Sequence, residues 1–341
     1  MSSKSDRAGN TFTSTLHSIP YPSIDPSLVT LPRPFVVCIA GASRDIGAHV
    51  AYSFAQAGVS GIAVCSPTIA EVQSSEIEAR VREIDPVIQT LNVVCDLTTE
   101  SSVDSFAASV EARFGRLDVL VYNAGFWGAW ETRVESTASD FSRAFDVNCK
   151  GMYLASTKLL PLLLASENGA QSIIAICSSD MHADGTTGHS TAYCISKMAQ
   201  CRYVEFLAAQ HPTLFTAAIQ PGSVQTEMAK VAPKQMYDSK SPAIEFHIMP
   251  TMPHWTQAAR LSQCRLLVRY AALLEDVRLG GSFVVWLTKE RRMWLSGRYL
   301  SAKWDVDELC ARQDEIVRGG KLKMRMVLWL RVLSQAEACL W

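Results

Sequence analysis

Short apolar runs alternate with helix-like segments along most of the chain. From Phe35, FVVCIAGA is a continuous apolar run that ends in glycine, IGAHVAYSFAQAG has helical spacing, and GIAVCS is a second apolar run. Similar runs follow at LNVVCD, LDVLVYNAG, SIIAICSS and LFTAAIQPG. Continuous apolar runs are typical of strands buried on both faces, and strands that alternate with helices form parallel sheets. With right-handed crossovers, the pattern predicts an α/β fold: a doubly wound parallel sheet in a Rossmann-like, three-layer α/β/α single domain.

The ends of the chain differ from this pattern. Residues 1–34 are rich in Ser, Thr and Pro, and they predict an extended N-terminal leader. The alternating pattern then places the domain at residues 35–310, followed by a C-terminal tail at 311–341. Five prolines break any regular element in the leader: Pro20, Pro22, Pro26, Pro32 and Pro34.

Composition excludes several classes of protein. A formal charge of -1, with Lys and Arg scattered, argues against a nucleic-acid partner. No apolar stretch is long enough to span a bilayer. The ten cysteines form no C-x-x-C pair and the start is polar, so we expect reduced thiols and a cytoplasmic location. The loop with Asp180, His182, Asp184 and His189 is read as solvated, and no metal site is predicted.

Distinctive residues follow the predicted strands. Sites in doubly wound sheets lie beyond the carboxyl ends of the strands, where strand order reverses. The turn from Gly41 to Gly47 opens a helix there, and its N-H groups and helix dipole can hold a pyrophosphate. The other strand ends carry Asp96, Asn123–Gly125, Ser178 with Ser179, and Pro221–Thr226.

Tyr193 and Lys197 lie four residues apart in the helical stretch STAYCISKMAQCRYVEFLA. Side chains at this spacing project from one face of a helix. A neighbouring ammonium group favours the phenolate form of a Tyr, which suits proton transfer. Taken alone, the pair is better explained by a packed Tyr beside a solvated Lys.

In combination, these motifs resemble those of the classical short-chain dehydrogenase/reductase superfamily. AGASRDIG at residues 40–47 is similar to its T-G-x-x-x-G-x-G turn, with Asp45 in place of the middle glycine. Six further motifs follow in order: CDLT with Asp96, NAG at 123–125, Asn148 in FDVNCKG, the Ser motif, the Tyr-x-x-x-Lys motif, and PGSVQT. The later segment SGRYLSAKWDVDEL resembles members from filamentous fungi.

The resemblance implies a catalytic set of Tyr193, Lys197, Ser179 and Asn148. Tyr193 would exchange a proton with the substrate oxygen, and Lys197 would lower the Tyr pKa and bind the nicotinamide ribose. Asn148 would hold a water for proton relay. The family's Ser usually stands thirteen residues before the Tyr, where this chain has Asp180. A one-residue insertion in the following loop favours Ser179, with Ser178 second.

The resemblance also implies a nicotinamide cofactor. The second strand ends in VCSPT, which lacks the carboxylate that would bind the ribose of NAD, while Arg44, Ser66 and Thr68 suit a 2'-phosphate. We therefore expect NADP(H) rather than NAD(H). The expected cofactor-binding residues are Gly41, Ser43, Arg44, Ile46, Gly47, Ser66, Asp96, Asn123, Ala124, Gly125, Tyr193, Lys197, Pro221, Gly222, Val224 and Thr226.

Asp45 is a departure from the family's turn. Asp tolerates left-handed backbone angles and can cap a helix, so we expect the turn to survive. Its carboxylate should weaken phosphate binding unless Arg44 offsets the charge.

The sequence leaves two interpretations open for the residues that would contact the substrate. Residues 227–275 are either a variable substrate lid or an aberrant insertion. Met252, Trp255, Leu261 and Leu266 fit a lipophilic pocket or ordinary packing, and Phe126, Trp127 and Trp130 suggest an aromatic wall.

Three functions are compatible with these residues. The first is an NADP(H)-dependent oxidoreductase that interconverts a ketone or aldehyde and an alcohol, with a lipophilic secondary metabolite as a candidate substrate. The second is a non-enzymatic NADP-binding sensor or partner protein, suggested by Asp45 and the shifted Ser. The third is a non-redox dehydratase or isomerase. The resemblance further implies a homodimer or homotetramer.

Overall fold

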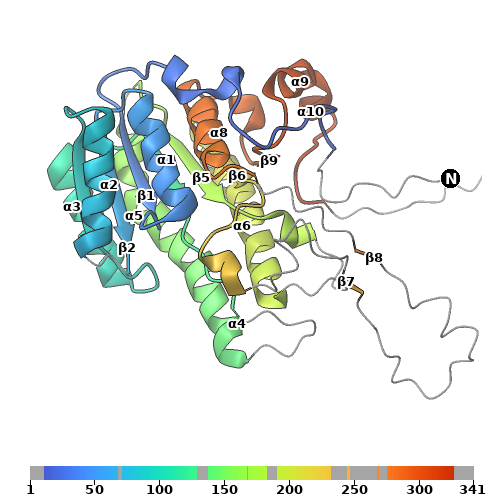
Figure 1. Cartoon of the computed structure of the whole chain (residues 1–341), viewed down its shortest axis with the longest axis horizontal. Coiled ribbons are helices and arrows are strands. Elements are labelled where there is room, and N and C mark those ends of the chain that lie inside the picture. The colour runs from blue at the N-terminus through green and yellow to red at the C-terminus, as the bar shows by residue number, and fades with distance from the viewer. Residues whose placement is uncertain are drawn as a thin grey trace, which may run out of the picture.

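The predicted parallel sheet is present at the centre of the molecule (Figure 1). The computed structural model describes residues 11–67, 71–128, 137–166, 168–182, 190–231, 244–245, 267–268 and 275–325. Seven parallel strands stand in the order β3-β2-β1-β4-β5-β6-β9, and this confirms the doubly wound topology. The strands are β1 (Val36–Ala40), β2 (Gly61–Ser66), β3 (Gln89–Val94), β4 (Val119–Tyr122), β5 (Ser172–Ile176), β6 (Phe215–Gln220) and β9 (Arg298–Ser301).

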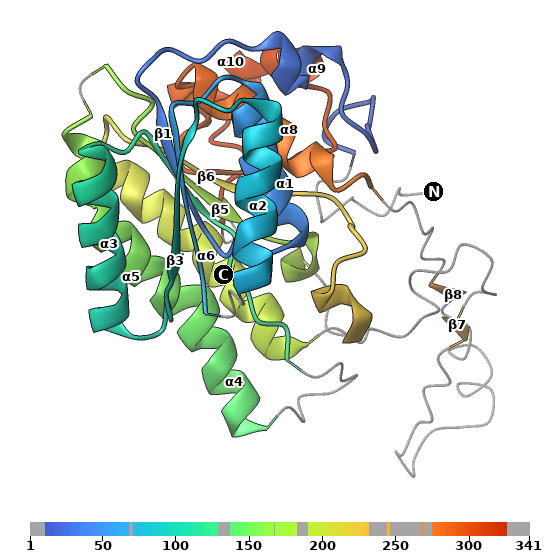
Figure 2. The same ribbon diagram turned by 60° about the vertical axis from the view of Figure 1, so that its left-hand side comes forward.

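Helices cover both faces of the sheet (Figure 2). Helices α1, α2 and α8 lie on one face, where α1 packs against both of the others, and α3, α5 and α6 lie on the opposite face. A separate two-stranded ribbon pairs β7 (Ile244–Glu245) with β8 (Leu267–Val268). The helices are α1 (Asp45–Gln56), α2 (Glu71–Ile84), α3 (Glu100–Phe114), α4 (Ala138–Phe145), α5 (Gly151–Leu164), α6 (Thr191–Gln210), α8 (Arg278–Lys289), α9 (Val306–Ala311) and α10 (Gln313–Arg318).

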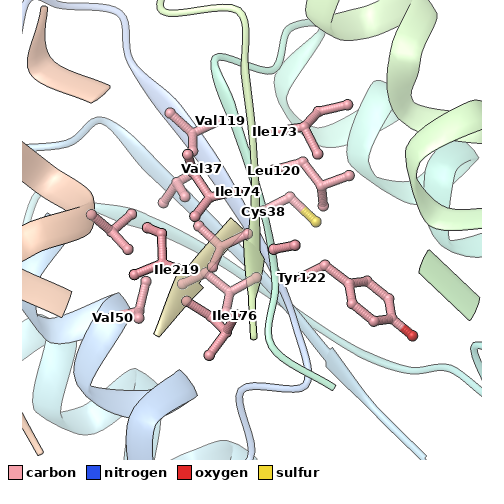
Figure 3. Packing of buried hydrophobic residues seen from close by; sticks show 14 of the residues in the cluster. Val37, Cys38, Val50, Val119, Leu120, Tyr122, Ile173, Ile174, Ile176 and Ile219 are labelled. Atoms are coloured by element: carbon pink, nitrogen blue, oxygen red, sulfur yellow. The ribbon is translucent and has the colours of Figure 1, made fainter. Parts of the chain in front are cut away.

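The core follows the central strands. Every residue of β1, β2, β4, β5 and β6 is buried, because helices cover both of their faces. Val37 on β1 stands in register with Val119 on β4, and Figure 3 shows their side chains beside Ile174. Burial on both faces explains why the sequence shows continuous apolar runs instead of alternation.

The central helical region is interrupted at the site. Its sequence resembles one long helix, but a π-helical segment, Asp146–Lys150, separates α4 from α5. Such widened turns are frequent at functional sites. This one buries Asn148 completely.

The described part of the leader is packed on the body, contrary to the expectation of a separate extended segment. We call residues 11–34 the N-terminal clasp. It contains the short 3-10 turns η1 (Pro22–Ile24) and η2 (Pro26–Leu28), and Ile24 and Leu31 are buried. Leu16 bridges Trp304 as an isolated antiparallel pair. The clasp is packed because its few apolar side chains find partners on the C-terminal elements.

The body also extends beyond residue 310. Helix α10 buries Ile316 and lies within the predicted tail, so the packed part reaches at least residue 325 among those described. Within the described ranges, no helix is both long and apolar enough to cross a bilayer.

Candidate active site

A cavity of about 480 Å³ opens at the carboxyl ends of the strands. This is the place that the doubly wound topology predicts. Gly47 and Asn148 are the two predicted site residues that do not line it. The predicted residues that do are Gly41, Ser43, Arg44, Ile46, Ser66, Asp96, Asn123, Ala124, Gly125, Ser178, Ser179, Tyr193, Lys197, Pro221, Gly222, Val224 and Thr226.

Two glycines allow the β1–α1 turn to pack closely. Gly41 has φ +87°, and a Cβ there would lie 2.6 Å from the Ala124 Cα. A Cβ on Gly47 would lie 2.7 Å from Asn123 Nδ2 and would overlap the Gly41 carbonyl oxygen. Gly47 therefore acts through the packing of the turn. The backbone at the start of α1 is left open to the cavity, which fits a pyrophosphate.

Asp45 takes the left-handed backbone of the glycine it replaces, with φ +51°. The predicted survival of the turn is thus seen, but the capping role is wrong. Arg44 occupies the N-cap position of α1, without a side-chain cap. The Asp45 Oδ2 instead accepts a hydrogen bond of 3.0 Å from the Glu227 backbone N-H, and Arg44 Nε lies 3.8 Å from the same oxygen.

Neighbouring motifs hold the turn in place. Asn123 Nδ2 donates to the Gly41 carbonyl over 2.6 Å, and the backbone N-H groups of Asn123 and Ala124 both donate to Ala40. Asp96 accepts hydrogen bonds from the backbone and hydroxyl of Thr98 and from the Thr99 hydroxyl, and these bonds lower its pKa. Asp96 is therefore ionised and oriented at the cavity rim.

Tyr193 and Lys197 are both buried in the first two turns of α6. Their exposed fractions are 7% and 2%, which rules out a solvated Lys. Lys197 Nζ donates to the Ile176 carbonyl at the end of β5 over 2.8 Å, and it lies 5.6 Å from the centre of the Tyr193 ring. The Ser190 hydroxyl accepts from the Tyr193 N-H and caps the helix. The strand end and the helix start thus position the pair together.

The electrostatics of Tyr193 differ from the expectation. Burial, followed by the charge of Asp180, raises the Tyr193 pKa above its usual value, and a hydrogen bond with the Ser178 side chain partly opposes this shift. Lys197 is not among the main causes of this shift. Burial lowers the pKa of Lys197 itself, and its Nζ is bonded to the Ile176 carbonyl. Tyr193 is consequently held in its protonated form.

The two candidate serines have different surroundings. Ser178 is the one whose side chain interacts with Tyr193, and its Oγ also accepts from the Asp180 N-H over 3.1 Å. Ser179 begins the 3-10 turn Ser179–His182 that leads away from β5. The contacts thus favour Ser178, whereas the sequence favours Ser179.

Asn148 supports the site from beneath the cavity. Its Oδ1 accepts from the Phe126 N-H over 2.8 Å, and its Nδ2 donates to the Phe126 carbonyl and to Ser196 Oγ. Its backbone carbonyl accepts from Gln200 Nε2 over 2.6 Å. The side chain thus holds the loop after the NAG motif, a function that its spacing in the sequence does not reveal.

Residues 35–236 match the family model described as short chain dehydrogenase. The chain belongs to this family. It is 34% identical over 324 residues to the short chain dehydrogenase mpl6 of Monascus purpureus, an alignment that covers 94% of this chain and 98% of that protein. The family prediction and its fungal resemblance are confirmed. The protein is thus an NAD(P)-dependent oxidoreductase that acts on carbonyl or alcohol groups.

Solved structures show the same fold. A short chain dehydrogenase from Shigella flexneri, solved in complex with NADP, superposes with a TM-score of 0.63 at 20% identity and covers 81% of this chain and 99% of its own. A 7α-hydroxysteroid dehydrogenase, complexed with NADH and 7-oxo glycochenodeoxycholic acid, superposes with a TM-score of 0.62 at 21% identity, covering 83% and 96%.

An aromatic wall stands beside Tyr193 in this dehydrogenase. Trp127 stacks on Tyr193 with ring centres 5.1 Å apart and planes 14° apart. The Arg143 guanidinium lies 4.5 Å from the centre of the Phe126 ring and also lines the cavity. Sequence reasoning missed Arg143, because no motif in the sequence marks its position. Thr68, Trp130, Met252, Trp255, Leu261 and Leu266 lie outside the described residues.

A buried ion pair supports the PGSVQT loop of the dehydrogenase. Glu275 Oε1 lies 2.6 Å from Lys303 Nζ, and the Glu275 Oε2 accepts a hydrogen bond from the Ser223 N-H. Gly222 has φ +109° beside the Glu275 side chain. The sequence does not indicate this support, because Glu275 and Lys303 lie far from the loop along the chain.

The described ranges hold no group of three or more His, Cys, Asp or Glu side chains that could bind a metal. His189 and Asp184, from the polar loop considered in the sequence, lie outside those ranges.

Proposed function

We propose that the chain is an NADP(H)-dependent oxidoreductase that interconverts a ketone or aldehyde and an alcohol, with Tyr193 as the acid/base. The observation that carries this proposal is the burial of Tyr193 and Lys197 in the cavity that the glycine turn also lines. A proton donor and a dinucleotide cradle in one cavity suit hydride transfer coupled to proton transfer.

Each residue of the site has a separate role in the reaction. When bound, the nicotinamide supplies or accepts the hydride. The Tyr193 hydroxyl gives its proton to the substrate oxygen during reduction and takes it back during oxidation. Tyr193 is protonated at neutral pH and can donate, since burial and Asp180 move its pKa further above neutral. Ser178, with Ser179 second, hydrogen-bonds the same oxygen, and Lys197 binds the ribose hydroxyls of the cofactor.

Three features support NADP(H) over NAD(H). No carboxylate stands at the end of β2, in the segment from Gly61 to Pro67. Ser66 lines the cavity at this strand end, and the half-exposed Arg44 lies at the edge of the cavity. A guanidinium and a hydroxyl suit a 2'-phosphate, whereas an acidic residue would suit free ribose hydroxyls. Among the structural neighbours, one was solved with NADP and another with NADH, so similarity alone does not decide the preference.

The other two candidate functions have less support. The non-enzymatic hypothesis rested on Asp45 and the shifted Ser, yet Asp45 keeps the turn and Ser178 interacts with Tyr193. A dehydratase or isomerase would use the same Tyr193. The proposed reaction consumes NADPH and forms alcohol in equal amounts, whereas a dehydratase or isomerase would consume no net NADPH.

Tyr193→Phe tests the proposed acid/base. Removal of the hydroxyl should lower turnover by at least about a hundredfold, the usual contribution of general acid catalysis, while NADPH still binds. Steady-state rates with a panel of ketones and aldehydes, together with NADPH fluorescence titration, measure the two effects. Tyr153→Phe, on an exposed part of α5, is the matched control and should keep full activity. Unchanged turnover in Tyr193→Phe would contradict the mechanism.

We further propose a homodimer in the cytoplasm that acts on lipophilic substrates. Helices α5 and α6 expose a set of apolar side chains that suits pairing between two copies, and the stacked Trp127 and Tyr193 suit an apolar substrate. The exposed side chains of this set are Leu164, Ile195, Met198 and Phe206.

A further inference from the structure

Two thiols meet beneath the catalytic Lys. Cys177 directly follows β5, and Cys201 lies one helical turn after Lys197 on α6. Their sulfur atoms are 3.6 Å apart, and both residues are buried. The Met181 sulfur lies 3.2 Å from the Cys201 sulfur. A buried Cys is usually inert, but a second thiol in contact gives it a partner for oxidation.

Cys177 connects this pair to the cavity. It is one of the residues that line the cavity, while Cys201 is not. Burial disfavours the Cys177 thiolate, but the hydrogen bond from Cys201 and the charge of Lys197 favour it, and the net effect lowers the Cys177 pKa. A small reagent that enters the cavity therefore meets the more acidic of the two thiols first.

We propose that Cys177 and Cys201 form a reversible disulfide when a peroxide enters through the cofactor cavity. The Cys177 thiolate attacks the peroxide, so that an S–O bond forms, the O–O bond breaks, and the leaving oxygen departs as water after protonation. The Cys201 sulfur then attacks the oxidised Cys177, forming the S–S bond and releasing the second oxygen as water. Two thiols lose two electrons and two protons, and the peroxide is reduced to two waters.

Closure of this disulfide should disturb Lys197. The sulfurs must approach from 3.6 Å to about 2 Å, which draws the end of β5 toward α6. Ile176, adjacent to Cys177, accepts the hydrogen bond from Lys197 Nζ, and Cys177 Sγ lies 3.7 Å from the Lys197 carbonyl oxygen. We therefore expect oxidation to inactivate the enzyme. This consequence rests on the proposed function, whereas the thiol chemistry does not.

The test treats the full chain with hydrogen peroxide, with and without NADP+, and measures intact mass and disulfide-linked peptides. We expect a loss of about 2 Da that maps to Cys177 and Cys201, is reversed by dithiothreitol, and is slowed by NADP+ in the cavity. Cys201→Ser should instead gain about 16 Da at Cys177, because the second thiol is gone. Cys201→Ala provides the same test without a buried hydroxyl.

Several results would overturn the proposal. These are no loss of mass, a link that maps to Cys65 and Cys95 or to another pair, or the same loss in the Cys201 variants. Activity should fall in step with the disulfide and return on reduction, and persistent activity in the linked protein would refute the coupling to Lys197. The Tyr193→Phe variant distinguishes the disulfide proposal from the proposed function. This variant should form the disulfide whether or not Tyr193 is the acid/base.

Discussion

At the scale of single residues, Tyr193 is under two opposing influences. Asp180 and burial raise its pKa, and the Ser178 interaction lowers it. A raised pKa keeps Tyr193 protonated well into the alkaline range, whereas alcohol oxidation needs the phenolate. Reduction should therefore be nearly independent of pH in the neutral range, and oxidation should speed up toward alkaline pH.

Ser178→Ala and Ser179→Ala form a matched pair that identifies the assisting hydroxyl. Ser178→Ala should lower kcat by about a hundredfold, the scale of losing one donor to the reacting oxygen. It should also move the alkaline rise of oxidation to higher pH, because an influence that lowers the Tyr193 pKa is lost. Ser179→Ala should leave that rise in place. Rates of alcohol oxidation across pH measure both effects, and a larger loss in Ser179→Ala would restore the preference drawn from the sequence.

The limits of sequence reasoning are clearest at these residues. The residue types at the strand ends were predictable, because parallel strands deliver their carboxyl ends to one edge of the sheet. Counting positions could not choose between Ser178 and Ser179, since the contact depends on a 3-10 turn that begins after Ser178. Nor could spacing show that the Asn148 amide is bonded to Phe126, a contact between the β4 end and the π-helical segment.

At the scale of elements, Asp45 joins the β1–α1 turn to the segment after PGSVQT through the Glu227 N-H. A glycine in that position would have no side chain to make this bond. The replacement of glycine by Asp45 therefore connects the β1–α1 turn to the segment after PGSVQT. Because Asp45 lines the cavity, the replacement also adds a negative charge there. Phosphate groups and a carboxylate repel each other, and salt screens the repulsion.

Asp45→Asn separates the charge from the hydrogen bond. The amide oxygen can still accept from Glu227, so the loop should stay in place while NADPH binds about threefold to tenfold more tightly, with a smaller gain in high salt. Asp45→Gly should also tighten NADPH binding but remove the connection to the loop. Titration of NADPH at several salt concentrations measures the effect. Weaker binding by Asp45→Asn would show that the carboxylate does not oppose the phosphates.

At the scale of the whole molecule, the N-terminal clasp closes on the C-terminal elements. The Tyr21 hydroxyl donates to the Trp304 carbonyl over 3.1 Å and accepts from the Val306 N-H over 2.8 Å. The Phe12 ring contacts Trp304, and Ser14 bonds Glu308. The prolines in residues 1–34 led us to expect a leader apart from the domain, because proline patterns report local backbone and not distant partners.

Tyr21→Phe tests whether the clasp contributes to stability. Loss of the hydroxyl leaves the Val306 N-H at the start of α9 without this acceptor, which should lower the free energy of unfolding by about 1–2 kcal/mol. Denaturant unfolding monitored by Trp fluorescence measures the change. Tyr153→Phe, at an exposed position, should stay within about 0.5 kcal/mol of the parent. Equal stability of the Tyr21 variant would mean that the clasp rests on the body without supporting it.

The clasp also determines when this protein can finish folding in the cell. Its residues leave the ribosome well before Glu308, which bonds Ser14 and follows 294 positions later. At roughly 5–20 residues per second, that interval lasts from about fifteen seconds to one minute. Throughout that time Ser14 lacks its partner on α9, and strand β9 at the edge of the sheet has yet to be made. The newborn chain therefore completes the contact between the clasp and α9 long after the clasp itself has been made.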